Sequence, residues 1–179
     1  MLTLDDPSVE RNILMSVERV AAIPRDHPLA KKARIEPKDL DGVDYISLSA
    51  SDHAREPLDR LFSKPKKIMT KGKLETRAIV PNERAECVLP AAAIQLADQG
   101  IGVSIIDHLT ASEHLGTNLV FRPFKPQLKM DIWLLKPKMR PRSRLTDLFI
   151  ETIQQAVEHD RLSVAPNWLF KDTPTAGLR

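Results

Sequence analysis

Four potential metal ligands lie close together in the second half of the sequence: Asp107, His108, Glu113 and His114. A zinc site in a protein needs three or four such side chains that converge on one point. Here the first pair ends a predicted strand and the second pair lies beyond a turn. No cysteine or further histidine is nearby to complete the set. We therefore expect no metal site and no cofactor.

The patterns of nucleophilic and phosphate chemistry are also missing. The sequence has neither a Gly-Lys-Ser/Thr phosphate loop nor a Gly-x-Ser-x-Gly nucleophile elbow. Gly100 and Gly102 resemble a fragment of a dinucleotide fingerprint, but they close a predicted helix and open a strand. In the fingerprint the glycines follow a strand and open a helix, so that the phosphate meets the helix N-terminus. We expect that the chain is not an enzyme.

A hydroxyl-rich turn is the remaining candidate site. Ser47, Ser49 and Ser51 follow a predicted strand and precede a predicted helix. Ligands of open α/β sheets bind at the carboxyl ends of the strands, where backbone N–H groups and hydroxyls can hold a carboxylate. The alternative is that one serine only caps the helix. Both uses employ the same N–H groups of the helix start, so both stay open.

The strands that would position these serines are predicted from short apolar runs that are bounded by turn residues. Within 43–49 the residues alternate between two faces, which is typical of a strand. The predicted strands are 16–24, 43–49, 74–80, 102–107 and 131–136.

Helical spacing of apolar residues lies between these strands. A helix is predicted over 82–99, kinked or split at Pro90 and stopped by Gly100. A short helix is predicted near Leu58, with Pro57 at its first position. The alternation of strands and helices predicts an α/β protein with a mostly parallel sheet.

The clearest helix is predicted over 143–158, with Ser143 as N-cap. Its apolar stripe is expected to be buried: Leu145, Leu148, Phe149, Ile153, Ala156 and Val157. In residues 161–179 the apolar side chains follow neither a helical nor a strand period. This segment is predicted to form a loose tail, with Trp168 and Phe170 packing back against the rest of the protein.

Composition bounds the class of protein. The 179 residues are 42% hydrophobic and 28% charged, with a net charge of +3 and one cysteine. This excludes a disulfide framework and favours a globular chain with Cys87 buried in a reducing compartment. The longest run without Asp, Glu, Lys or Arg, 87–97, is shorter than the roughly 18 apolar residues of a membrane span. Acidic residues near the N-terminus oppose a signal peptide, so we expect a cytoplasmic protein without membrane contact.

Basic residues gather in two segments, 60–77 and 121–144. Such runs are usually solvated faces. A nucleic-acid-binding role through Lys136–Arg144 stays a third-rank alternative. Pro137 and Pro141 predict an extended connector there rather than a recognition helix.

Four segments occur in an order typical of one family. They are VAAIPRDHPLA (20–30), IEPKDLDGVDYISLS (35–49), QLADQGIGVSIIDHLTA (95–111) and DIWLLKPKMRPRSRLTDLFIETI (131–153). Together they resemble the effector-binding domain of LysR-type transcriptional regulators, over about residues 4–158. The resemblance implies a periplasmic-binding-protein-like (type 2) fold, in which two α/β lobes joined by two crossover strands hold the effector between them.

Carried onto this sequence, the resemblance implies four parts. Residues 1–23 would hold a crossover segment and a remnant of the first lobe, and 24–125 would form the second lobe. Residues 126–160 would hold the return crossover strand and a terminal helix, and 161–179 the loose tail. Because no winged helix-turn-helix precedes Met1 and much of the first lobe is missing, we expect a truncated regulator with one lobe incomplete.

The resemblance also implies a function. A small effector, an amino acid, opine or organic acid, would shift the conformation of a regulator that is a homo-oligomer when intact and meets DNA only through a domain absent here. The expected effector contacts are Ser47, Ser49, Ser51 and Thr76, with Gly100 and Gly102 shaping the cleft. The alternatives are a stand-alone solute-binding protein of the same fold and a degenerate, non-functional remnant.

Overall fold

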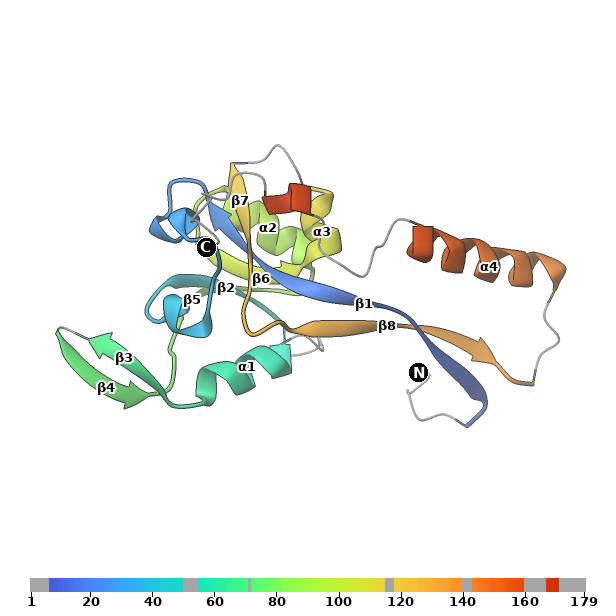
Figure 1. The fold of residues 1–179 in the computed structure, drawn as a ribbon, viewed down its shortest axis with the longest axis horizontal. Helices are drawn as coiled ribbons and strands as arrows, with labels where there is room; N and C mark the ends of the chain where they lie inside the picture. Colours follow the sequence, from blue (N-terminus) through green and yellow to red (C-terminus); the bar gives the residue numbers. More distant parts are fainter. Residues whose placement is uncertain are drawn as a thin grey trace, which may run out of the picture.

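The computed structural model describes residues 7–49, 55–70, 72–114, 118–139, 143–159 and 167–170. Its main sheet follows the order β5-β2-β6-β1-β7, and β8 also pairs with β1 (Figure 1). The strands of this sheet are β1 Val9–Pro24, β2 Asp44–Leu48, β5 Asn82–Cys87, β6 Val103–Asp107, β7 Leu119–Pro123 and β8 Lys129–Pro137. A separate hairpin consists of β3 Lys66–Thr70 and β4 Lys73–Arg77.

Helices cover both faces of the sheet, so the predicted α/β class is confirmed. In Figure 1, α1 lies on one side of the strands and α2 and α3 lie on the other. The helices are α1 Arg55–Ser63, α2 Pro90–Asp98, α3 His108–Ser112 and α4 Arg144–His159, with 3₁₀ turns η1 Pro28–Lys31, η2 Pro37–Leu40 and η3 Asn167–Phe170. No helix among the described residues is long and apolar enough to cross a membrane.

The sheet is mixed rather than mostly parallel, so that part of the prediction is wrong. Strands β5, β2 and β6 are parallel, but β1 runs antiparallel to β6, β7 and β8. The sequence pattern identifies β2, β6, β8 and part of β1, but it misses β5 and β7 and carries no signal for the direction in which strands pair. The carboxyl ends of β5, β2 and β6 nevertheless meet at one edge, as the ligand-binding argument requires.

Two apolar clusters form the core, one on each face of the sheet. Strand β2 serves both, because its side chains alternate: Ile46 and Leu48 belong to the cluster under α2, and Tyr45 belongs to the cluster under α1. Cys87 is buried in the α2 cluster, as predicted.

The helix predicted over 82–99 is wrong in its first half. Residues 82–87 form β5, which pairs parallel with β2, and α2 begins at Pro90. Proline is favoured in the first helical turn, where its missing N–H has no partner to lose. Gly100 follows the end of α2 with φ +78°, so the predicted stop is confirmed. The predicted strand 74–80 becomes the shorter β4, which pairs with β3 and not with the main sheet.

The helix near Leu58 is confirmed, but it begins at Arg55, which makes Pro57 its third residue. Ser143 caps α4 as predicted, because its hydroxyl accepts a hydrogen bond from the N–H of Thr146 at 3.2 Å. In the tail, Leu169 is buried and Phe170 packs against the α2 cluster. The side chain of Trp168, like residues 160–166 and 171–179, lies outside the described residues.

A two-stranded ladder extends from the body. The first half of β1 pairs with β8 from Val9–Pro137 to Glu18–Lys129, and α4 lies beside the outer part of this ladder, next to β1 (Figure 1). The apolar stripe of α4 was expected to be buried, but Leu145, Leu148 and Phe149 are exposed, at 75, 57 and 62%. The reason is that α4 lies away from both core clusters, where no described element covers this face.

Candidate functional site

Ser47 and Ser49 lie at the carboxyl edge of the parallel strands. The N–H of Ser49 donates to the carbonyl of Cys87 at 2.9 Å, which ties the end of β2 to the end of β5. Both serines are buried, at 4 and 8% exposure. The Ser47 hydroxyl lies 3.4 Å from the carbonyl of Ala85. The structure therefore brings two of the predicted site residues together, whereas Ser51 lies outside the described residues.

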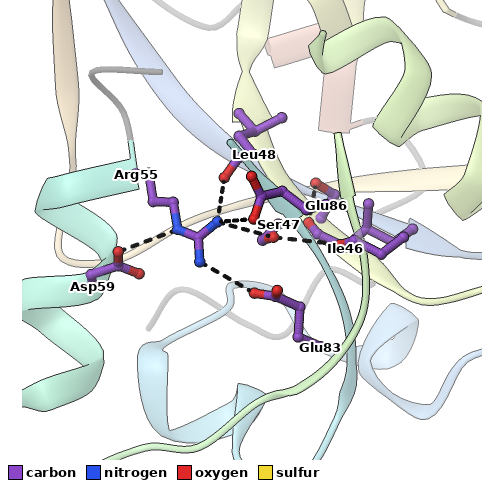
Figure 2. A network of polar contacts seen from close by, with 9 residues as sticks. Ile46, Ser47, Leu48, Arg55, Asp59, Glu83 and Glu86 are labelled. Carbon is purple, nitrogen blue, oxygen red and sulfur yellow. Dashed lines mark hydrogen bonds and ion pairs between the residues drawn. The ribbon is translucent and has the colours of Figure 1, made fainter. Parts of the chain in front are cut away.

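Arg55 reaches this edge from α1 (Figure 2). Its Nη1 donates to Glu86 at 2.8 Å and to the carbonyl of Leu48 at 3.0 Å. Its Nε reaches Asp59 at 3.3 Å, and its Nη2 reaches Glu83 at 3.4 Å. Burial opposes the charge, but the surrounding carboxylates, Glu86 first, raise the pKa of Arg55. One guanidinium thus holds α1, β2 and β5 in register at their ends.

Arg55 and its carboxylate partners were not among the residues predicted for the site. The spacing of Arg55 and Asp59, four residues apart on a helix, is a detectable signal for an ion pair. Glu83 and Glu86 were assigned to a helix, which hid their position on a strand beside β2.

The other predicted site residues lie elsewhere. Thr76 is on the exposed hairpin strand β4, opposite Lys67. Gly102 lies against the amino end of β2, where an added Cβ would be 2.6 Å from the carbonyl oxygen of Asp44. Because β2 and β6 are parallel, Gly100 and Gly102 are at the opposite edge from Ser49.

Three of the four potential metal ligands have structural partners. Asp107 caps α3, accepting from the N–H of Thr110 at 2.8 Å and from its hydroxyl at 2.7 Å. The Nδ1 of the buried His108 accepts from the N–H of Glu18 at 3.0 Å, and the Nδ1 of His114 lies 2.8 Å from the carbonyl of Thr110. Within the described ranges, no group of three or more His, Cys, Asp or Glu is arranged to hold a metal.

Comparison with known proteins shows the family to which a chain with this fold belongs. The LysR substrate binding domain family matches residues 1–158, so the chain belongs to this family. The resemblance of the four ordered segments is thereby confirmed.

Among curated relatives, the chain is 34% identical to the transcriptional activator protein LysR of Escherichia coli (strain K12) over 153 residues, which are 85% of this chain and 45% of that protein. It is 25% identical to the regulatory protein NocR of Agrobacterium tumefaciens (strain T37) over 158 residues, 88% of this chain and 49% of the relative. The chain therefore spans about half the length of these relatives.

Solved structures share the fold. The effector-binding domain of QuiR in complex with shikimate superposes with a TM-score of 0.66 at 21% identity, covering 88% of this chain and 69% of that one. The BenM effector-binding domain with its effector benzoate superposes with a TM-score of 0.65 at 21% identity, covering 93 and 71%. The periplasmic-binding-protein-like fold expected from the sequence is confirmed.

Proposed function

We propose that this chain is the effector-sensing part of a LysR-type transcriptional regulator, and that its effector is a small amino acid, opine or organic acid. The observation that carries the proposal is the family match over residues 1–158. By their names, one of the curated relatives is a transcriptional activator protein and the other is a regulatory protein. The titles of two fold neighbours describe complexes with shikimate and benzoate.

The effector contacts are proposed at the carboxyl edge, around Ser47 and Ser49. Hydroxyls and backbone N–H groups at such an edge can hold a carboxylate without a metal. The guanidinium of Arg55 already faces three carboxylates, so it is a poor first partner for an anionic effector. Contacts through Ser51 and Thr76, and shaping of the cleft by Gly100 and Gly102, stay predictions.

The proposed mechanism is a population shift. Residues 24–125 would be one lobe, and β1 and β8 would be the crossover strands, which belong to segments 1–23 and 126–160. An effector that binds one lobe arrangement better than another shifts the equilibrium by its differential affinity. In a longer, homo-oligomeric cytoplasmic regulator this shift would reach DNA through another domain.

A thermal-shift screen tests the proposal. A ligand present at about 100 times its Kd adds about 2.7 kcal/mol, which for a chain of this size corresponds to a rise in Tm of about 5–10 °C. Ser49→Ala should reduce the rise. Ser63→Ala, at the other end of α1, should leave it unchanged. If no amino acid, opine or organic acid raises the Tm of this chain or of a full-length regulator that contains it, the effector proposal is wrong.

A further inference from the structure

A cavity of about 220 Å³ lies between α1 and strands β2 and β5, on the α1 face of the sheet. Its inner wall is apolar and includes Leu58, Phe62 and Ile79, all of which are buried. Its polar lining consists of the buried Ser47 and of Arg55, Asp59 and Glu83, which form its rim together with the exposed Val80. Sites for drug-sized ligands have about 300–1,000 Å³, so this cavity suits a smaller molecule with a short apolar part.

Tyr45 supplies an unused hydrogen-bonding group in this cavity. Tyr45 lines the cavity and is only 5% exposed, and its ring packs edge-on against Phe62 with the ring centres 5.9 Å apart. Among the described residues, its hydroxyl makes no hydrogen bond, and because the oxygen is not among the fully buried atoms without a partner, it is open to the cavity. A buried tyrosine hydroxyl usually has a partner. Burial and, next, the charge of Asp59 raise the pKa of Tyr45, so the hydroxyl stays protonated at neutral pH.

The charge at the rim selects the kind of partner. Asp59, Glu83 and Glu86 surround the single guanidinium of Arg55, at 3.3, 3.4 and 2.8 Å (Figure 2). This cluster has a formal net charge of −2, and its members that line the cavity, Arg55, Asp59 and Glu83, have a net charge of −1. A carboxylate ligand would have to displace acidic side chains from Arg55. An ammonium ligand would instead meet the excess negative charge directly, since opposite charges favour each other at this range.

We propose that this cavity binds a small organic ammonium ion, with its apolar stem against Leu58, Phe62 and Ile79 and its cationic head between Asp59 and Glu83. The Tyr45 hydroxyl and the carboxylates then share the polar contacts of the bound molecule. The cavity shares Ser47 with the edge proposed for the effector but does not include Ser49, so substitution of Ser49 distinguishes the two proposals.

The protein has a single tyrosine, which makes a direct test possible. The full chain is labelled with ¹³Cζ-tyrosine and titrated with n-butylammonium chloride. Sodium n-butyrate, which has a similar stem and the opposite charge, is titrated separately at the same ionic strength. We expect a saturable shift of the Tyr45 resonance with butylammonium and at most a tenth of that shift with butyrate.

Matched variants locate the cation. Glu83→Gln and Asp59→Asn should each weaken butylammonium binding about fivefold, the upper range for a partly exposed charge pair. Glu151→Gln makes the same change of net charge on the exposed surface of α4 and should leave the affinity within about twofold. Using both rim variants keeps the test valid if one of them fails to fold, which circular dichroism will show.

Three results would overturn the proposal: a non-saturable shift, an equal shift with butyrate, or the same loss of affinity in Glu151→Gln as in the rim variants. The effector proposal is tested separately. Ser49→Ala should leave butylammonium binding unchanged, and Glu83→Gln should leave the response to an organic acid unchanged.

Discussion

Replacing Gly102 with alanine should destabilise the fold through a single added methyl group. In this position the new Cβ would lie 2.6 Å from the carbonyl oxygen of Asp44, 2.8 Å from its carbonyl carbon and 3.1 Å from the backbone nitrogen of Tyr45. All three atoms are backbone atoms of β2, so they cannot rotate away as the end of a side chain can. Strands β2 and β6 must therefore separate at their amino ends.

The size of the effect follows from two opposing contributions. Inserting one carbon into a packed site lowers the free energy of unfolding by about 1–3 kcal/mol. The loss is larger where only backbone atoms could move to make room. Alanine in place of glycine returns about 0.4–1 kcal/mol by restricting the unfolded chain. We expect a net loss of about 2 kcal/mol in the free energy of unfolding, which corresponds to a fall in Tm of about 4–8 °C.

Thermal unfolding followed by circular dichroism measures this loss, and Gly72→Ala is the matched control. Gly72 has φ +77° with nothing within 4 Å of an added Cβ, so its cost comes from the left-handed backbone alone and stays local to the exposed hairpin. An unchanged Tm for Gly102→Ala, within about 1 °C, would refute the steric reasoning.

Three further substitutions test other parts of the fold. The guanidinium of the buried Arg122 donates hydrogen bonds to the carbonyls of Ala30 and Lys32, in and directly after η1. Arg122→Met should therefore lower the free energy of unfolding, measured in urea, by about 3 kcal/mol. An equal loss for the exposed Arg60→Met would contradict this reasoning. Burial lowers the pKa of His27, whose Nδ1 accepts from the N–H of Leu29. The unfolded chain therefore binds the proton more readily, and stability should decline as the pH falls below about 6.5. His27→Asn should make this decline smaller. An unchanged dependence of stability on pH in this variant would contradict the role given to His27. Phe149→Ser should change the free energy of unfolding by less than about 0.5 kcal/mol because Phe149 is 62% exposed; a larger loss would mean that α4 packs against the body.

Local signals in the sequence predicted much of the fold. The serine cap of α4, the glycine stop after α2 and the alternation of β2 are each determined by neighbours within a few residues. Strand β5 was missed because the small residues around Ala85 match a helical period as well as a strand. Only the pairing with β2 decides between the two, and that contact joins residues about forty positions apart.

The candidate site was predictable to the extent that it depends on β2. Ser47 and Ser49 follow from the position of a strand end, which the sequence indicates. The cavity under α1 requires Tyr45 from one strand, Glu83 from another and Arg55 from a helix. No short sequence window contains all three, and the misassigned helix over 82–99 placed Glu83 on the wrong kind of element. Contacts between residues far apart in the sequence, and not the residue types, therefore limited how much of the site could be predicted.

Strand β1 has a mechanical consequence for the molecule. Its first half belongs to the ladder with β8, and its second half, Arg19–Pro24, lies between β6 and β7. Because β1 is one continuous strand across this junction, a force applied to the ladder acts on a central strand of the main sheet and not on an edge strand. There the load is shared by hydrogen bonds on both flanks and acts along the strand, in shear. A displacement of the ladder would therefore be transmitted to the body as a sliding of β1 rather than as the peeling of an outer strand.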